Sequence, residues 1–478
     1  MRRILVTAIC AATLAAHGSA RAAVVAAPGY AARRIPTPGA VQGGVVRQGN
    51  ALIVGQGSFG PGTERVVRLD GAVATTIATG FNSLGGFDLD GDTLYLVDNC
   101  FGTDFGCTGA STGDSLYAIP SATTRTSAAA ADTSAVLPAG SITAPQDVLV
   151  VPGALLVADA IGVGAGRVVK VVGTTPTNLA TGLDYLGGLA TDGATLFAAN
   201  LDGSFTGSVK RFSLAGVPAS DLVGGLSGSY GVARDAAGNL LVTGGFTGDF
   251  SSSTLLAVDA GGTATERAHG FGFSADVLFD GARDAALVLD FGVSAVTAVC
   301  RDADGDAVCD ADCTSPAALD RAVVKIGRQT TAVGDDTLSF KGQMTIPGVY
   351  DPVANGVHVL VDDAAGSVIA DVVVPGGAYD TVTGTGWKTN ASLTSWTYKN
   401  PSGVVGITKV KVKKASSTPG LVKFSVNGRK GGYPAAGAAL PVRAVMTLDP
   451  AGGCALATFS GPTSGCTFNS TGDRLTCK

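Results

Sequence analysis

The sequence predicts an all-β protein that consists of a six-bladed β-propeller followed by a C-terminal β-sandwich. Three observations lead to this fold class: a strand-turn-strand unit recurs six times, the charge balance changes near residue 313, and short alternating strands fill the last third. We place a signal peptide at 1–22, the propeller at 23–299, a linker rich in Asp and Cys at 300–313, and the sandwich at 314–478.

The repeated unit is a short apolar strand, a turn containing Gly or Asp, and a second apolar strand. Its copies are "GGVVRQGNALIVG" (43–55), "GGFDLDGDTLYLVDN" (85–99), "QDVLVVPGALLVAD" (146–159), "GGLATDGATLFAAN" (187–200), "YGVARDAAGNLLVTGG" (230–245) and "ADVLFDGARDAALVLD" (275–290). A third strand follows each copy, and units of roughly 40 to 50 residues with three or four strands are typical of propeller blades. The sixth copy runs into the linker after its third strand, whereas residues 30–39, "YAARRIPTPG", resemble the fourth strands of other blades. We therefore expect the N-terminal strand to complete the sixth blade.

The N-terminus predicts export. Arg2 and Arg3 precede an apolar run that ends near Ala16, and residues 20–22, Ala-Arg-Ala, have the small-x-small pattern at which signal peptides are cleaved. We expect the mature protein to be secreted, periplasmic or at the cell surface. No later stretch approaches the roughly 18 to 20 apolar residues of a membrane helix, so we expect no membrane span.

Eight cysteines follow the signal peptide, and an even number in an exported protein indicates disulfide bonds. They are Cys100, Cys107, Cys300, Cys309, Cys313, Cys454, Cys466 and Cys477. We expect Cys100 to pair with Cys107. The other two groups hold three cysteines each, so a bridge between the groups would pair the odd thiols. Cys466 has two possible partners, Cys454 and Cys477.

The linker "CRDADGDAVCDADC" (300–313) places five aspartates and three cysteines in fourteen positions. Aspartates two residues apart, followed by a backbone carbonyl and further aspartates, supply the oxygen ligands that Ca²⁺ prefers. The predicted ligands are Asp302, Asp304, Asp306, the Val308 carbonyl, Asp310 and Asp312. The segment resembles one thrombospondin type 3 repeat, which implies that its aspartates wrap calcium while nearby cysteines form disulfides. We expect a structural calcium ion that stiffens the hinge between the domains; the alternative is an acidic, solvated linker.

The fifth repeat, "YGVARDAAGNLLVTGG", resembles an NHL-type repeat, the propeller class that includes gluconolactonase-like hydrolases and streptogramin-lyase-like proteins. The resemblance implies a divalent metal at the central channel in the lactonase-like members, held by a glutamate, asparagines and an aspartate. The lyase-like members rely on a histidine and a glutamate. This chain has only two glutamates, Glu64 and Glu266, and neither is expected at the end of an inner strand; its histidines after the signal peptide are His269 and His358.

Polar residues end the second strands of several blades, on the face where propeller loops converge. They are Asp98, Asn99, Asp159, Asn200 and Asp290. Together they could bind a hard cation or another ligand. The alternative is that each accepts hydrogen bonds from the backbone of a neighbouring turn.

Basic residues concentrate in the predicted sandwich. From Thr314 onward there are 16 Lys and Arg against 10 Asp, whereas the preceding residues have 17 against 28 Asp and Glu. Lys409, Lys411 and Lys413 share one face of a predicted strand. Such a stripe can attract an anionic polysaccharide or cell-surface phosphate, or it can be the solvated face of a charged edge strand. Trp396 and Tyr398 also share a face, as a core pair or as a platform that stacks on sugars.

These observations favour an exported, non-catalytic binding or adhesion protein with a calcium-stabilised hinge. The alternative is a metal-dependent propeller hydrolase or lyase that acts at the central channel. The motifs H-E-x-x-H and Walker A do not occur in the sequence. We expect a monomer whose partner is a cell-surface or anionic polysaccharide ligand and not a nucleic acid.

Overall fold

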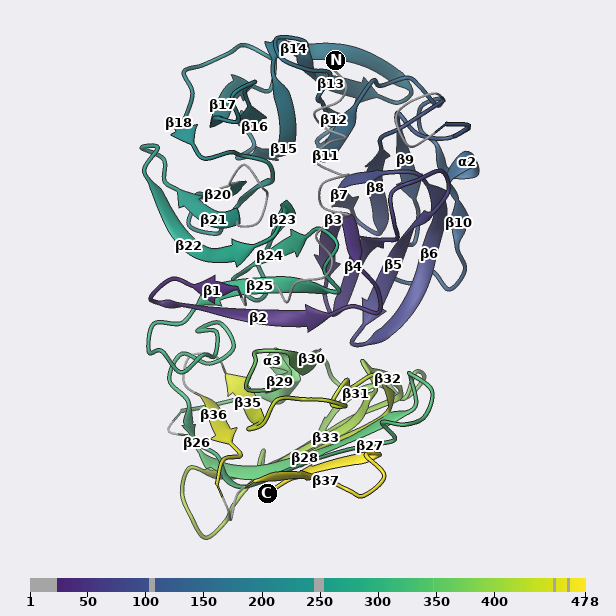
Figure 1. Ribbon diagram of the computed structural model, residues 1–478. Helices are drawn as coiled ribbons and strands as arrows, with labels where there is room; N and C mark the ends of the chain where they lie inside the picture. The colour runs from purple at the N-terminus through teal and green to yellow at the C-terminus, as the bar shows by residue number, and fades with distance from the viewer. Residues whose placement is uncertain (1–23, 103–107, 245–252, 347, 450–452, 462–464) are drawn as a thin grey trace.

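The computed structural model describes residues 24–102, 108–244, 253–346, 348–449, 453–461 and 465–478. It contains a ring of sheets with three to five strands each in the N-terminal part, and an eight-stranded and a five-stranded sheet in the C-terminal part (Figure 1). The fold is therefore the predicted six-bladed propeller followed by a β-sandwich. Among the described residues, no helix has the length and apolar character needed to cross a membrane.

Each of the six copies of the sequence repeat forms the first two strands of one blade. Blades one to three are β3 (Val41–Gln48), β4 (Ala51–Gln56), β5 (Glu64–Asp70) and β6 (Val73–Phe81); β7 (Leu84–Asp90), β8 (Thr93–Asp98) and β9 (Ser115–Ile119); and β11 (Pro145–Val151), β12 (Ala154–Asp159), β13 (Gly166–Val172) and β14 (Thr175–Leu183). Blades four to six are β15 (Tyr185–Thr191), β16 (Thr195–Leu201), β17 (Gly207–Ser213) and β18 (Val223–Leu226); β19 (Val232–Arg234), β20 (Leu240–Gly244), β21 (Ser253–Val258) and β22 (Ala264–Phe271); and β23 (Ser274–Asp280), β24 (Ala285–Asp290) and β25 (Ala295–Arg301). A short strand, β10 (Ala129–Ala130), pairs with β6, and the helix α2 (Ala131–Ser134) follows it.

The N-terminal segment completes the ring. Strand β2 (Tyr30–Pro36) pairs antiparallel with β25 along its whole length, which is the pairing expected for residues 30–39. Strand β1 (Val25–Ala26) pairs with β22 and so adds to the fifth blade. The ring therefore closes by hydrogen bonds between the two ends of the propeller sequence, which leaves little exposed sheet edge.

Glycines let the inner strands approach one another at the centre of the ring. A Cβ atom on Gly44 of the first blade would lie 2.5 Å from the backbone nitrogen of Phe87 in the second blade. A Cβ on Gly188 would lie equally close to the backbone nitrogen of Val232. No Cβ fits at such distances, so the Gly-Gly pairs of the repeat serve this close backbone approach.

The sandwich packs an eight-stranded sheet against a five-stranded one. The eight-stranded sheet is ordered β31 (Gly386–Thr389), β32 (Ser395–Val404), β33 (Ile407–Lys414), β34 (Leu421–Gly431), β28 (Asp336–Thr345), β27 (Asp320–Gly327), β38 (Arg474–Cys477) and β37 (Cys466–Phe468). The five-stranded sheet is ordered β26 (Ala317–Ala318), β36 (Gly453–Thr458), β35 (Arg443–Asp449), β29 (Val357–Asp362) and β30 (Val368–Val374), and the helix α3 (Pro352–Asn355) precedes β29. Trp387, Trp396 and Tyr398 are at most 3% exposed and belong to the core between the sheets. The interpretation of Trp396 and Tyr398 as a core pair is therefore confirmed, and a sugar-stacking platform is excluded.

Three disulfide bonds hold the linker and the end of the chain. Cys300 pairs with Cys309 inside the linker, and Cys313 pairs with Cys454 of β36. Cys466 pairs with Cys477 across the last hairpin, which decides between its two possible partners. The expected Cys100–Cys107 bridge involves Cys107, which lies outside the described residues.

Candidate functional site

The polar residues that end the second strands hold turns of their own blades. Asp98 accepts hydrogen bonds from the backbone nitrogens of Asn82 and Ser83, at 3.0 and 2.7 Å. Asp290 accepts from Gly272 and Phe273 at 3.0 and 2.8 Å. In each case the donors lie just before the inner strand of the same blade.

The corresponding residues of blades three and four act in the same way. Asp159 accepts from the Ala144 nitrogen at 2.8 Å and from Nε of Arg167 at 2.7 Å. Asn200 accepts from the Asp184 nitrogen at 2.9 Å. Asn99, half-buried, follows the end of β8, and its backbone nitrogen donates to the Ser83 carbonyl. These are the hydrogen bonds expected from the alternative in which such residues hold the backbone of a neighbouring turn. That the five residues together bind a ligand stays a prediction.

Three aspartates, Asp147 buried and Asp88 and Asp276 half-buried, lie on inner strands where the sequence suggested only apolar strand residues. Asp88, Asp147 and Asp276 each accept one hydrogen bond from the next residue and one from the inner strand of the following blade. Burial raises the pKa of Asp276 to about 7, and it raises the pKa of Asp147 well above its usual value, with a further contribution from Asp276. A signal was present in the recurring Asp-Val of "QDVLV" and "ADVLF". These carboxyl groups link neighbouring blades around the centre.

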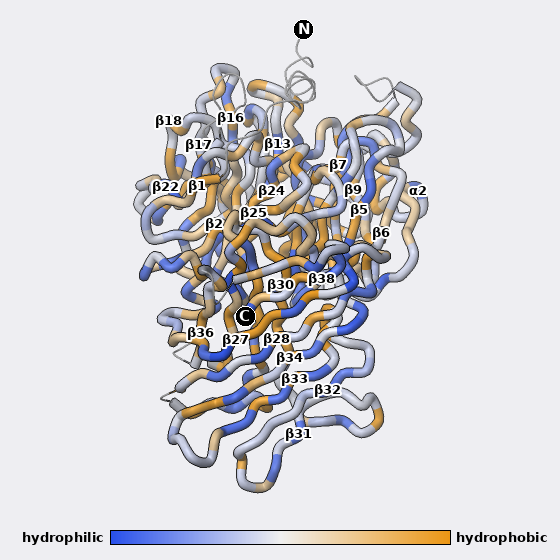
Figure 2. The backbone as a smooth tube through the Cα atoms, turned by 60° about the horizontal axis from the view of Figure 1, so that its bottom comes forward, coloured by the Kyte–Doolittle hydropathy of each residue, from blue (hydrophilic) through white to orange (hydrophobic). Residues whose placement is uncertain are grey.

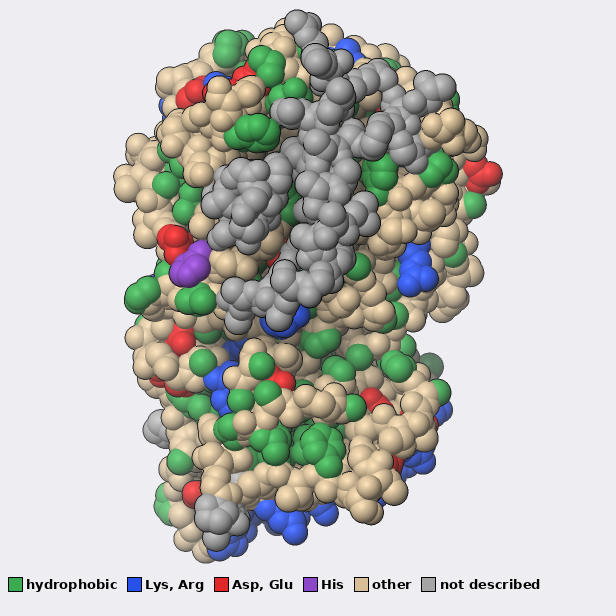
Figure 3. Space-filling model, viewed as in Figure 1, with side chains coloured by type: hydrophobic (Ala, Val, Ile, Leu, Met, Phe, Trp, Pro, Cys, Tyr) green, Lys and Arg blue, Asp and Glu red, His purple; other side chains and the backbone are tan. Residues whose placement is uncertain are grey.

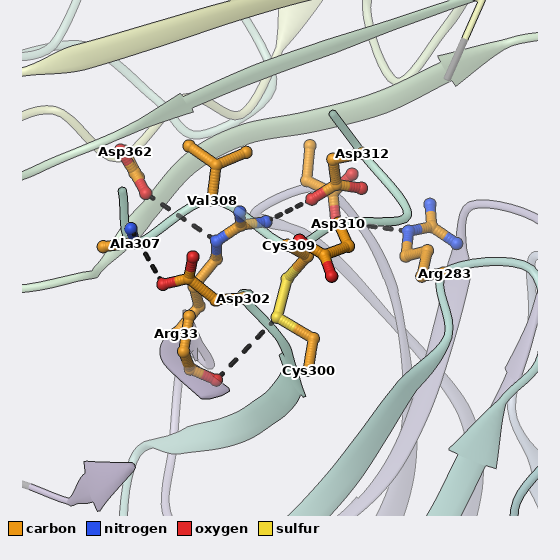
Figure 4. The surroundings of a disulfide bond; sticks show 12 residues. Arg33, Arg283, Cys300, Asp302, Ala307, Val308, Cys309, Asp310, Asp312 and Asp362 are labelled. Carbon is orange, nitrogen blue, oxygen red and sulfur yellow. Dashed lines mark hydrogen bonds and ion pairs between the residues drawn. A yellow bond between two sulfur atoms is a disulfide. The ribbon is translucent and has the colours of Figure 1, made fainter. Parts of the chain in front are cut away.

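The linker contains a possible cation site. Ligand oxygens of Asp302, Asp304 and Asp310 lie within 4.8 Å of one another, and no other group of three or more acidic, His or Cys side chains in the described ranges is so arranged. Both carboxylate oxygens of Asp302 also accept backbone hydrogen bonds within the loop, including that from Ala307 (Figure 4). Oδ2 of Asp306 is buried, and no group in the described part of the chain forms a hydrogen bond with it. Ca²⁺ takes carboxylate oxygens as ligands. A buried carboxylate oxygen without a hydrogen-bond partner among the described residues, in the same loop as three clustered carboxylates, therefore fits a calcium ion.

Asp312 lies in the interface between the two domains. Its carboxylate forms a buried ion pair with Arg33 of β2 (Figure 4), and its Oδ1 lies 3.3 Å from Nδ1 of His358 on β29. Its backbone carbonyl accepts a hydrogen bond from the Thr447 hydroxyl at 2.6 Å. The side chain is 5% exposed. Asp312 does not belong to the cluster of Asp302, Asp304 and Asp310, and its carboxylate contacts Arg33 of the propeller and His358 of the sandwich instead.

A second set of buried charges joins the propeller to the sandwich. Arg283, in the turn between β23 and β24, and Arg47 of β3 face Asp371 of β30, with nitrogen-oxygen distances of 3.3 and 3.8 Å. Nε2 of His358 lies 2.7 Å from the same carboxylate. Burial alone would raise the pKa of Asp371, but Arg283, His358 and Arg47 outweigh it and hold that pKa well below its usual value. The domain junction is therefore fixed by buried ion pairs as well as by the linker disulfides.

The outer face of the eight-stranded sheet carries a large set of lysines, which we call the lysine face. Its members are exposed, and they are Lys325, Lys341, Lys388, Lys399, Lys409, Lys411, Lys413 and Lys423. Figure 2 shows hydrophilic residues alternating with hydrophobic ones along these strands, and Figure 3 shows Lys and Arg gathered along the lower rim of the sandwich. Among the described residues, none of the eight forms an ion pair with a carboxylate.

Two pairs of these lysines lie directly opposite one another. In the antiparallel register, Lys399 faces Lys409 and Lys413 faces Lys423. Side chains in such positions have Cβ atoms about 4.5–5.5 Å apart, and like charges there are destabilising. An anion bound over the lysine face would relieve this repulsion.

Comparison with known proteins gives similarity at the level of structure. No protein-family model matches the chain, and no curated protein matches it. A gluconolactonase from Xanthomonas campestris aligns with 59% of this chain and 98% of its own, at 14% identity and a TM-score of 0.42. A calcium-binding protein, regucalcin, from Agrobacterium tumefaciens aligns with 56% of this chain and 93% of its own, at 16% identity and a TM-score of 0.38. A putative TolB from the same organism aligns with 57% of this chain and 98% of its own, at 13% identity and a TM-score of 0.38.

Proposed function

We propose that the protein is an exported binding or adhesion protein whose lysine face binds an acidic polysaccharide. The observation that carries this proposal is the eight-lysine surface, which has no carboxylate partner among the described residues and in which two lysine pairs face each other across neighbouring strands. Neighbouring strands lie about 4.8 Å apart, so the face presents closely spaced cations on a broad sheet. A chain of carboxylated sugars can contact several of these cations at once.

The rigid junction supports a binding role. The ion pairs of Arg283 with Asp371 and of Arg33 with Asp362 fix the sandwich against the propeller. A ligand held at the lysine face is therefore held at a constant orientation to the propeller. We further propose that a calcium ion at Asp302, Asp304 and Asp310 stiffens the linker that runs beside this junction.

The test is binding to polygalacturonate, with neutral dextran as the control polymer. Replacing Lys409, Lys411 and Lys413 with glutamine should weaken binding by roughly 3- to 150-fold, because each exposed charge pair contributes about 0.2–1 kcal/mol. A matched variant, in which Lys170, Lys210 and Arg211 of the propeller become glutamine, should bind as the wild type does. Equal binding by the lysine-face variant, or equal binding of dextran, would contradict the proposal.

A metal-dependent hydrolase or lyase at the propeller channel is the second candidate. The observation that favours it is the set of Asp88, Asp147 and Asp276 on the inner strands, because carboxyl groups with raised pKa values are frequent in catalytic sites. The similar structures include a gluconolactonase, so gluconolactone and simple esters are the substrates to assay, with Ca²⁺, Mg²⁺ or Zn²⁺ added. Turnover that is abolished in Asp290→Ala and retained in the lysine-face variant would establish this candidate.

A further inference from the structure

The propeller contains a pocket that the proposed function does not use. It lies between the fifth and sixth blades, at the seam where β2 closes the ring, and has a volume of about 280 Å³. Pockets for small molecules start at about this size. Its floor is apolar, with Leu241, Leu255 and Val299 among the lining residues, and it is continuous with the buried core between these two blades.

A cation with available donors lies on one wall. The guanidinium of Arg267 stacks on the ring of Tyr30, with its central carbon 4.4 Å from the ring centre. This stacking orients the planar group. Its nearest carboxylate oxygen, on Asp235, lies 3.8 Å away, which is too far for a hydrogen bond. Asp235 instead accepts two hydrogen bonds from Asn239, at 2.8 and 2.9 Å. The N–H groups of Arg267 can therefore donate to an incoming carboxylate.

A carboxylate lines the same pocket. Asp284 is exposed in the turn between β23 and β24, and within the described part of the chain it makes no hydrogen bond or ion pair. It can therefore pair with a positively charged group of a ligand. The pocket thus combines an apolar floor, a donor for an anion and an acceptor for a cation.

We propose that this pocket binds a small zwitterion with an apolar side chain, that is, a free apolar amino acid. The ligand carboxylate pairs with Arg267, its ammonium group pairs with Asp284, and its side chain covers the apolar floor. Bidentate pairing of a guanidinium with a carboxylate fixes the orientation of the ligand. The inference does not depend on the lysine face.

The experiment is calorimetric titration of the purified protein with L-phenylalanine and L-leucine. Phenylacetate and phenethylamine, which each lack one of the two charges, serve as comparison ligands. We expect the amino acids to bind, and each comparison ligand to bind roughly 10- to 100-fold more weakly, as expected for the loss of a hydrogen bond to a charged group. Absence of binding by both amino acids at millimolar concentration would overturn the proposal, as would equally tight binding of phenylacetate.

Two variants locate the site. Arg267→Gln should weaken phenylalanine binding by a similar factor, and Ala237→Trp should abolish it by filling the mouth of the pocket from an exposed turn. Because Ala237 is exposed, this change leaves the core intact even if Arg267→Gln destabilises the fold. Arg211→Gln, on another blade, is the control and should bind as the wild type does. Unchanged binding by Ala237→Trp would place the ligand elsewhere and refute the assignment.

Discussion

Replacing Arg283 with methionine should lower the free energy of unfolding by about 3–5 kcal/mol, the usual cost of removing one partner of a buried ion pair. The Arg283 side chain is 7% exposed and lies 3.3 Å from carboxylate oxygens of both Asp371 and Asp280. It also donates to the Gly49 carbonyl at 3.1 Å and to Oδ1 of Asn50 at 3.2 Å. Methionine fills much of the same volume but leaves these acceptors without their cation.

The stability of the variant should also respond differently to pH. The folded protein holds the pKa of Asp371 below its usual value, so the ion pairs stabilise the fold above the unfolded pKa and lose that effect as the pH falls through the folded one. The difference between wild type and Arg283→Met should therefore be complete at pH 7 and shrink below about pH 4.

The measurement is urea unfolding followed by tryptophan fluorescence, because both tryptophans lie in the sandwich core. The control is Arg301→Met, which removes an ion pair with Asp310 whose arginine is 68% exposed. That change should cost less than about 1 kcal/mol. If Arg283→Met were no less stable than Arg301→Met, the buried charges would not be what holds the two domains together.

Three further changes test other parts of the structure. Burial raises the pKa of Asp276 to about 7. The protonated carboxyl group therefore contributes fully to stability below the unfolded pKa near 4, and this contribution is lost as the pH rises through 7. The Tm of the wild type should fall between pH 5 and 8 more steeply than the Tm of Asp276→Asn. Replacing Cys313 and Cys454 with serine opens a bridge between residues 141 positions apart and should cost about 2–5 kcal/mol in chemical unfolding; an unchanged midpoint would show that the interface charges suffice. Calcium at 100 times its Kd should stabilise the wild type by about 2.7 kcal/mol in thermal unfolding, and Asp304→Ala, but not Asp335→Ala, should abolish this effect; identical curves in EDTA and calcium would exclude the linker site.

The propeller could be predicted from the sequence because each blade is a local unit. Its two inner strands are adjacent in the chain, and the six copies repeat the same Gly-rich turn. The aspartates that link inner strands were missed because their partners belong to the next blade: Asp276 bonds to Val45, 231 residues away. The pattern of residues along one strand shows which side chains share a face, but it does not show which residues of a distant strand lie opposite them.

The same limit applies to the sandwich and the interface. Alternation predicted that Lys409, Lys411 and Lys413 share a face, but the strand order β33-β34-β28-β27 brings Lys341 and Lys325 to that face from much earlier in the chain. The spacing of aspartates assigned Asp312 to a calcium loop. Its partner Arg33 lies 279 residues away, and only the folded chain shows that this contact takes the carboxylate out of the loop.

Strand β2 has a consequence for the order of assembly. It pairs with β25, and its Arg33 and Arg34 also contact the sandwich: Nε of Arg33 lies 3.9 Å from Asp362, and Arg34 forms a bridge to Ser367. The first long strand of the chain thus has no partner until β25 (Ala295–Arg301) has followed it. Closure of the ring and packing of the sandwich against the propeller then occur together, late in folding. A fusion or truncation that disturbs residues 30–36 would therefore disrupt both the ring closure and the contact between the domains.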